Sequence, residues 1–247
     1  MHPKLKDSFK TAKALKIISG LNNFDSKRVL AVVKAAEAGG ATFVDIAADP
    51  SLVKLVRQET SLPICVSAVD PQKFVTAVEA GADLIEIGNF DSFYAEGRYF
   101  DGDEVLALTK ATRSLLPKIT LSVTVPHILP ADEQVKLAKE LVAAGADLIQ
   151  TEGGTSSQPT SPGVLGLIEK AAPTLAAAYN ISAAVSVPVI CASGLSSATI
   201  PMAIAAGATG VGVGSAINKL NDPIAMVATV RALAEALSAT NSKQIQV

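Results

Sequence analysis

A short phrase that begins with glycine and alanine recurs four times along the chain, and it constrains the fold more than any other feature. Each copy follows a helix-like stretch and leads into an apolar run. Because glycine tolerates the left-handed conformation that commonly ends helices, each copy predicts a helix end followed by a buried strand. The last copy carries glycines where the others carry larger side chains. The four copies are Gly40–Asp45, Gly81–Glu86, Gly145–Gln150 and Gly207–Ser215.

Strand-like runs alternate with helical stretches along the whole chain, and Asp-Pro pairs such as Asp49-Pro50, Asp70-Pro71 and Asp222-Pro223 mark helix starts. Strict alternation of strands and helices without a linker predicts a single (β/α)8 TIM barrel over residues 1–247. The second possibility is an open doubly wound sheet. Residues 1–13 are expected to be an N-terminal helix or extension and residues 240–247 a flexible tail. The expected strands are Ala14–Gly20, Phe43–Ala47, Pro63–Ala68, Leu84–Gly88, Ile119–Val125, Leu148–Glu152, Pro188–Ser193 and Gly210–Gly214.

Charge and composition exclude several classes of protein. The formal net charge is -2 and no clustered basic face is evident, so nucleic acid is not an expected partner. Cys65 and Cys191 lie in apolar runs and are expected to be buried, reduced thiols. The uncharged run from Ala171 to Asn218 contains prolines and glycines that divide it into short pieces, so it predicts barrel interior and not a membrane span. Met1 to Lys16 lack the character of a signal or transit peptide.

Alternation along the repeated strands predicts which side chains face the barrel interior. Strand residues point to opposite faces in turn, and the apolar partners such as Val44, Ile85 and Val211 are expected to face the outer helices. Carboxylates would then project into a low-dielectric interior, which is costly unless they are paired or used. The expected inward set is Asp45, Ala47, Glu86, Gly88, Gln150, Glu152, Gly212 and Gly214.

Four side chains are candidate catalytic groups. Glu152 is expected nearest the carboxyl-end mouth, where barrel enzymes carry their chemistry, with Glu86 one layer deeper and Asp45 beside it. The alternative is an internal ion-pair and hydrogen-bond cluster, with Lys16, that fills the lower barrel. His127 follows the fifth strand and is either a general base or an ordinary loop histidine.

Two glycine-containing loops predict a phosphate site. In a barrel the exits of the seventh and eighth strands adjoin, and a short helix near Ser215 would point free N–H groups at an anion. The alternative is tight turn geometry without a ligand. The glycines at 88, 212 and 214 would leave room for a ligand near the backbone. The candidate phosphate-binding residues are Ser193, Gly194, Gly212, Gly214 and Ser215.

Aromatic residues are concentrated after the fourth strand, where the segment Phe90–Phe100 holds five of the ten Phe and Tyr residues. It is expected to be either a flap over the mouth or a satellite core or subunit contact of a homo-oligomer. Neither histidine has partners at metal-ligand spacing along the chain, so no metal site is predicted. No lysine is expected at the mouth end of a strand, which disfavours a Schiff-base mechanism.

Several phrases together resemble the Ycf family known as hypothetical chloroplast reading frame twenty-three, of cyanobacteria and algal plastids. The resemblance covers nearly the whole chain and implies a phosphate-binding barrel located in a cyanobacterial cytoplasm or plastid stroma. It implies no particular reaction. Ala192-Ser193-Gly194 and Gly212-Val213-Gly214 are shared more widely, with thiazole synthase and flavin-dependent oxidoreductases among others. The phrases are Lys16–Asp25, Val44–Asp49, Glu86–Asp91, Leu121–His127 and Gln150–Gly153.

Three functions remain open from the sequence. The first is a lyase or isomerase that uses acid/base chemistry on a small phosphorylated metabolite, with no cofactor. The second is an oxidoreductase that binds flavin mononucleotide, FMN. The third is a non-catalytic sensor of a phosphorylated metabolite. Because specificity depends on loop geometry on a shared fold, the substrate does not follow from the sequence.

Overall fold

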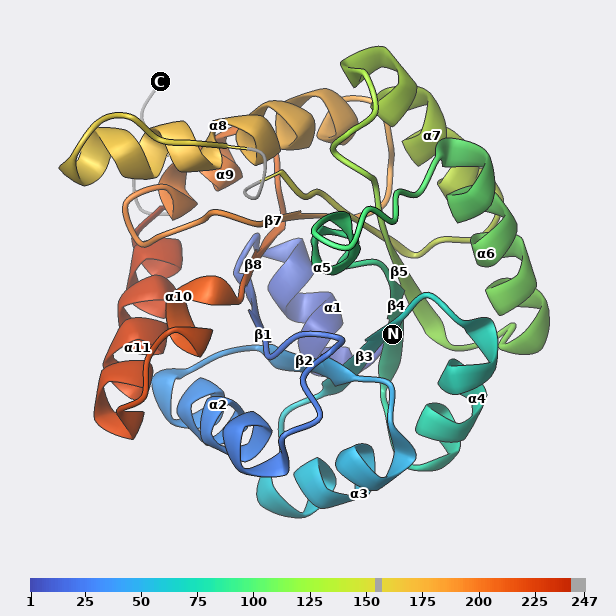
Figure 1. The fold of residues 1–247 in the computed structure, drawn as a ribbon, viewed down its shortest axis with the longest axis horizontal. Coiled ribbons are helices and arrows are strands. Elements are labelled where there is room, and N and C mark those ends of the chain that lie inside the picture. Colours follow the sequence, from blue (N-terminus) through green and yellow to red (C-terminus); the bar gives the residue numbers. More distant parts are fainter. Residues whose placement is uncertain (154–156, 241–247) are drawn as a thin grey trace.

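The computed structural model describes residues 1–153 and 157–240, and its centre is a closed barrel of eight parallel strands (Figure 1). Each strand pairs with the next, and β1 pairs with β8 to close the ring. The predicted (β/α)8 barrel is therefore confirmed and the open sheet is wrong. The strands are β1 (Ala14–Ile18), β2 (Phe43–Ala47), β3 (Ile64–Ala68), β4 (Leu84–Ile87), β5 (Thr120–Thr124), β6 (Leu148–Gln150), β7 (Val189–Ala192) and β8 (Gly210–Val213).

Helices surround the barrel, and Asp-Pro pairs start three of them as predicted. The side chains of Asp49, Asp70 and Asp222 accept hydrogen bonds from N–H groups in the first turns of α3, α4 and α11. Gly40 and Gly207 adopt φ values of 89° and 96°, as the predicted helix ends require. The helices are α1 (Pro3–Lys10), α2 (Ser26–Gly39), α3 (Pro50–Glu59), α4 (Pro71–Glu79), α5 (Asp91–Tyr94), α6 (Gly102–Leu115), α7 (Ala131–Ala143), α8 (Gly163–Ser182), α9 (Ile200–Ala205), α10 (Ser215–Asn218) and α11 (Pro223–Thr240).

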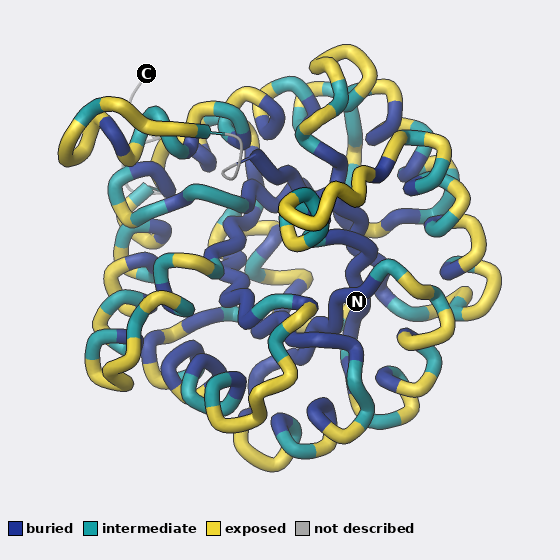
Figure 2. The backbone as a smooth tube through the Cα atoms, in the orientation of Figure 1, coloured by how far each residue is buried: buried dark blue, intermediate teal, exposed yellow. Residues whose placement is uncertain are grey.

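Strand side chains face two different environments. Val44, Ile85 and Val211 belong to the main core between the strands and the outer helices, as the alternation predicts. The strands are buried along their length, while exposed residues lie on the outer helices and on the loops (Figure 2). None of the helices in residues 1–153 and 157–240 is long and apolar enough to cross a membrane.

Helix α1 closes the amino-end floor of the barrel. Its buried Leu5 and Phe9 form a separate apolar cluster with residues from the strand starts, and the rings of Phe9 and Phe43 lie 6.2 Å apart edge to face. In Figure 1 this helix is seen in the middle of the ring. In residues 1–153 and 157–240, side chains of α1 and of the strand starts thus fill the amino end of the barrel. The predicted tail, 240–247, lies outside the described residues except for Thr240, which ends α11.

Candidate functional site

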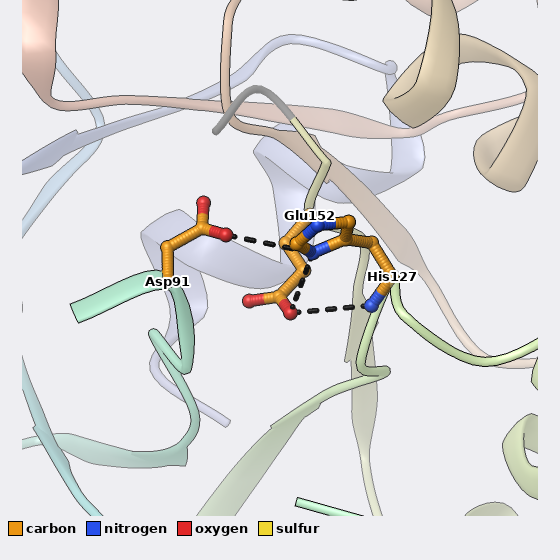
Figure 3. A group of neighbouring side chains, drawn as sticks. All are labelled: Asp91, His127 and Glu152. Atoms are coloured by element: carbon orange, nitrogen blue, oxygen red, sulfur yellow. Dashed lines mark hydrogen bonds and ion pairs between the residues drawn. The ribbon is translucent and has the colours of Figure 1, made fainter. Parts of the chain in front are cut away.

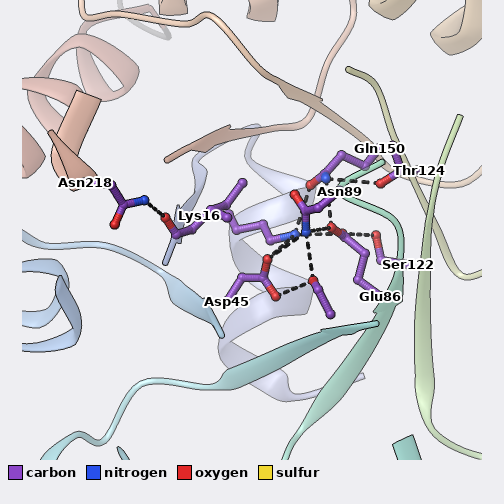
Figure 4. A network of polar contacts seen from close by, with 10 residues as sticks. Lys16, Asp45, Glu86, Asn89, Ser122, Thr124, Gln150 and Asn218 are labelled. Atoms are coloured by element: carbon purple, nitrogen blue, oxygen red, sulfur yellow. Dashed lines mark hydrogen bonds and ion pairs between the residues drawn. The ribbon is translucent and has the colours of Figure 1, made fainter. Parts of the chain in front are cut away.

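The middle of the barrel holds a polar group, here called the inner cluster, whose members are buried except for the half-buried Asn89. Lys16 lies at its centre, with Nζ 2.7 Å from Glu86 Oε2 and 3.5 Å from Asp45 Oδ2, and it donates a hydrogen bond to Gln150 Oε1 (Figure 4). Strand register explains the meeting, because Lys16 pairs with Gly212 on one side and with Phe43, two residues before Asp45, on the other. The cluster comprises Lys16, Asp45, Ser67, Glu86, Asn89, Ser122, Thr124 and Gln150.

Every acid of the inner cluster has hydrogen-bond partners. Glu86 accepts bonds from Ser122 Oγ at 2.8 Å and Gln150 Nε2 at 2.8 Å, in addition to its ion pair. Burial raises the pKa of Glu86, and the charge of Lys16 only partly offsets this. Burial alone would lower the pKa of Lys16, but the charges of Asp45 and Glu86 outweigh it and raise that pKa. Such saturation favours the internal ion-pair interpretation for Asp45 and Glu86, and a catalytic role for them stays a prediction.

A second group of ionisable side chains lies at the carboxyl-end mouth, and we call Asp91, His127 and Glu152 the mouth cluster (Figure 3). His127 Nδ1 is 3.1 Å from Glu152 Oε1 and 3.5 Å from Asp91 Oδ1. The backbone N–H of His127 also donates to Glu152 Oε1 at 3.2 Å. Tyr94 donates its hydroxyl to the same oxygen, and Ser193 Oγ donates to Asp91 Oδ2 at 2.9 Å. The exits of β4, β5, β6 and β7 all contribute to this group.

Burial and mutual contact set the proton affinities of the mouth cluster. Burial, together with the charge of Asp91, raises the pKa of Glu152 despite the hydrogen bonds from His127 and Tyr94. Burial alone would lower the pKa of His127, but the hydrogen bond and charge of Glu152 and the charge of Asp91 raise it overall. Burial and the carboxylate of Glu152 also raise the pKa of Tyr94. Glu152, His127 and Tyr94 therefore hold their protons more firmly than the same groups in water.

One oxygen of Glu152 has no hydrogen-bond partner. Its Oε1 accepts three contacts, whereas Oε2 is buried and has no partner among the described residues. A buried, unpaired carboxylate oxygen is costly, and it commonly marks a place where a ligand or ion completes the site. Glu152 also lines the main cavity of the protein. The unpaired oxygen therefore belongs to a residue that borders the cavity.

The aromatic segment Phe90–Phe100 contributes to the core and to the mouth of the barrel, and its use as a flap or subunit contact stays a prediction. Phe90, Phe93 and Phe100 pack together, with the ring of Phe100 4.6 Å from that of Phe90 and 5.4 Å from that of Phe93, and they are part of the main core and not of a satellite core. Tyr94 instead lies beside the mouth cluster, with its ring 5.1 Å from that of His127. In Figure 1 the short helix α5 lies over the barrel opening. The segment therefore anchors one residue above Glu152.

A cavity of about 640 Å³ opens at the mouth and joins this cluster to the exits of β7 and β8. Asp91 and Glu152 line one part of it, and the predicted phosphate residues Ser193, Gly194, Gly214 and Ser215 line another. These positions adjoin because β7 pairs directly with β8. Lysine side chains also border the cavity, and they are Lys170 and Lys219.

Backbone conformation distinguishes the predicted phosphate residues. Ser193 and Gly194 both have positive φ, 76° and 74°, which for serine is an uncommon and strained conformation. The predicted short helix starts at Ser215 as α10. Gly212 is not among the residues that line the cavity. A Cβ at this position would lie 2.9 Å from Ala192 Cβ. A phosphate role for these five residues stays a prediction.

The interpretation of Gly88 and Gly212 as room for a ligand is wrong. A Cβ on Gly88 would lie 2.0 Å from Thr124 Oγ1, so both glycines allow close packing of neighbouring side chains. Gly214 does border the cavity. The sequence analysis did not name Asp91 or Tyr94 as site residues. Both lie in the segment Phe90–Phe100, which follows β4. The expectation of no metal site rested on spacing along the chain, whereas the fold brings Asp91 to His127 and Glu152.

Comparison with known proteins places the chain in a family. The model of the family described as a protein of unknown function, DUF561, matches residues 1–243. The chain belongs to the Ycf23 family. The uncharacterized protein ycf23 of Cyanophora paradoxa is 48% identical over 228 residues, which are 92% of this chain and 93% of that protein. The ycf23 protein of Porphyra purpurea is 41% identical over 241 residues, covering 98% and 91%. The predicted resemblance to this family is confirmed.

Solved structures with the same architecture show how the Ycf23 family fold compares with known barrels. A thiamine phosphate pyrophosphorylase from Pyrococcus furiosus aligns over 94% of this chain and 98% of its own, with 17% identity and a TM-score of 0.61. A 3-hexulose-6-phosphate synthase aligns over 90% and 99%, with 20% identity and a TM-score of 0.63. A (S)-3-O-geranylgeranylglyceryl phosphate synthase from Thermoplasma acidophilum, in complex with sn-glycerol-1-phosphate, aligns over 97% and 100%, with 15% identity and a TM-score of 0.63. At these identities the likeness extends to the fold.

Proposed function

We propose that this protein is a lyase or isomerase that moves a proton on a small phosphorylated metabolite. One observation carries the proposal: a single cavity is lined both by the Ser193-Gly194 and Gly214-Ser215 exits and by the carboxylate of Glu152. A phosphate held by the two loop exits would place the rest of a small substrate beside Glu152. The cavity volume of about 640 Å³ is in the range of small-molecule sites.

The phosphate end is supported by charge and by backbone geometry. Two successive residues of positive φ, Ser193 and Gly194, turn the backbone so that N–H groups can converge on an anion. Lys170 and Lys219 border the same cavity and would add favourable charge. Each of the three solved barrels named above is named for a phosphate compound, and that of Thermoplasma acidophilum was solved with sn-glycerol-1-phosphate. These names support a phosphorylated ligand here.

The proton-transfer end is supported by the free oxygen of Glu152. Oε2 has no partner among the described residues, while Tyr94 and His127 fix the other oxygen. A carboxylate held in this way is oriented for general acid/base work. The Lys16 amine is buried, paired with Glu86 and outside the cavity lining, so Lys16 is not placed to form an imine with a substrate there.

Phosphate binding is tested with inorganic phosphate and sn-glycerol-1-phosphate as probes. We expect both to raise the melting temperature in a saturable way, and Ser215→Asp, which adds a negative charge, to abolish the rise. Ser215→Ala is the matched control and should retain most of it. An unaltered shift in Ser215→Asp would remove the phosphate assignment.

Proton transfer is tested by deuterium incorporation, which detects exchange at carbon whatever the final product is. Phosphorylated sugars of three to six carbons are incubated with the protein in deuterated water and followed by NMR. We expect exchange at a carbon next to a carbonyl for at least one substrate, and a loss of about 10²–10⁴-fold in Glu152→Gln. Glu133→Gln, an exposed acid on α7, is the control.

The other two functions have distinct outcomes in the same preparations. An FMN oxidoreductase would take up FMN with a change in its visible spectrum. A sensor would bind a phosphorylated sugar without exchange or turnover. Either result, in the presence of phosphate binding, would replace the lyase or isomerase assignment. Location in a cyanobacterial cytoplasm or plastid stroma and assembly as a homo-oligomer also stay predictions.

A further inference from the structure

We propose that Asp91, His127 and Glu152 form a binding site for one divalent transition-metal cation, of the Zn²⁺ or Mn²⁺ type. The site deepens the proposed function, because it lies at the proton-transfer end of the same cavity and rests on that function for its purpose. Three properties of the mouth cluster support it. They are the separation of the donor atoms, the free oxygen of Glu152 and the charge of the two acids.

The donor atoms have the separations of a coordination shell. Bonds of about 2.0–2.1 Å in a tetrahedral site place neighbouring donors about 3.3 Å apart. His127 Nδ1 lies 3.1 Å from a Glu152 oxygen and 3.5 Å from an Asp91 oxygen. One donor from each residue lies within 4.8 Å of the others.

The second observation is the unpaired oxygen of Glu152. The side chain is 4% exposed, and its Oε2 is buried without a partner in residues 1–153 and 157–240. The other oxygen is already held by Tyr94 and by the backbone of His127. Orientation of a ligating carboxylate by outer groups of this kind is typical of metal sites. A cation that Glu152 binds through both carboxylate oxygens would give Oε2 the partner that it lacks.

Charge points in the same direction. Two carboxylates flank one imidazole, and no lysine or arginine in the described part of the chain forms an ion pair with Glu152. A divalent cation would compensate both acids, whereas a protonated His127 compensates one. One nitrogen and two carboxylates form a mixed donor set that suits Zn²⁺ or Mn²⁺ better than Mg²⁺ or Ca²⁺, which prefer oxygen alone.

Three protein ligands leave coordination positions open toward the cavity, as in catalytic metal sites. A carbonyl or hydroxyl oxygen of the phosphorylated substrate would occupy one of them. A bound ion would supply Lewis-acid chemistry at this end of the cavity, and Glu152 would be one of the residues that hold it. The metal-free protein keeps Glu152 as the group that transfers the proton.

Binding is measured by titrating chelator-treated protein with Zn²⁺ and with Mn²⁺ in a calorimeter, without substrate. We expect one ion per chain, weaker binding of Mg²⁺ and Ca²⁺, and at least a tenfold loss of Zn²⁺ affinity in each of Asp91→Asn, His127→Gln and Glu152→Gln. Loading with Co²⁺ should give a visible spectrum that changes in His127→Gln. Circular dichroism and thermal unfolding of the metal-free variants check that each is folded.

Controls separate this site from adventitious binding. Glu133→Gln changes an exposed acid, and His2→Ala removes the other histidine, so neither should alter the stoichiometry or the affinity. Absence of a stoichiometric site would overturn the proposal. So would a Zn²⁺ affinity in all three ligand variants equal to that of the wild type. Phosphate binding and deuterium exchange in chelator-treated protein would persist in that case, so the proposed function would stand separately.

Discussion

Lys16 is expected to hold the barrel interior together, and its replacement by methionine provides a quantitative test. Lys16→Met keeps a long apolar stem but removes the ion pairs at 2.7 Å with Glu86 and 3.5 Å with Asp45, and the hydrogen bond to Gln150. All three charged side chains are fully buried. Removing one partner of a buried pair costs about 3–5 kcal/mol, because the remaining charge is uncompensated. The total free energy of unfolding of a domain is typically about 5–15 kcal/mol.

Urea unfolding followed by circular dichroism measures this loss. Burial already raises the pKa of Glu86, and removal of Lys16 raises it further. An acid whose folded pKa is raised destabilises the fold as pH rises from the unfolded value toward the folded one. The loss in free energy of unfolding caused by Lys16→Met should therefore be largest at pH 7. It should shrink as the pH falls toward the ordinary pKa of glutamate. The added change Glu86→Gln should recover part of it at pH 7.

The matched control is Lys34→Met, which removes an exposed ion pair with Glu59. Surface pairs contribute about 0–1 kcal/mol, so this variant should unfold close to the wild type. A loss below about 1 kcal/mol in Lys16→Met, or a deficit that does not depend on pH, would contradict the assigned role of the lysine. It would mean that the acids of the inner cluster are satisfied without it.

Three further outcomes are expected. Phe9→Ala removes a ring from the floor of the barrel and should lower the free energy of unfolding by about 3–5 kcal/mol in urea melts. A decrease of less than about 1 kcal/mol would contradict a packed floor. Gly88→Ala should cost about 1–3 kcal/mol, because its Cβ would meet Thr124 at 2.0 Å, and wild-type stability would contradict this close contact. Cys65 and Cys191 are buried, and burial raises the pKa of Cys191 to about 11, so a thiol reagent at pH 8 should modify neither until the chain is unfolded.

The regular part of the fold was predictable because it depends on local rules. The repeated glycines, the Asp-Pro helix starts and the alternation of Val44 with Asp45 each act within a few residues. These patterns predict the barrel and place Asp45 and Glu86 inside it. The ion pairs with Lys16 were one of two alternatives that the sequence left open for these acids.

The mouth cluster could not be derived from the sequence. Asp91, His127 and Glu152 are separated by 25 residues or more along the chain, and loop conformations bring them together. No periodic pattern encodes those conformations. The same limit explains the error at Gly88, where absence of a side chain indicated space although the neighbouring Thr124 fills it. Packing between adjacent strands decides such positions.

Closure of the barrel floor by α1 has a kinetic consequence for any reaction in the cavity. Leu5 and Phe9 fill the amino end, and the inner cluster lies between them and the cavity. Reactant and product must therefore use the same route, past α5. Occupancy by one excludes the other, so a product that retains the phosphate should inhibit competitively against the reactant, and its dissociation would limit turnover at high conversion.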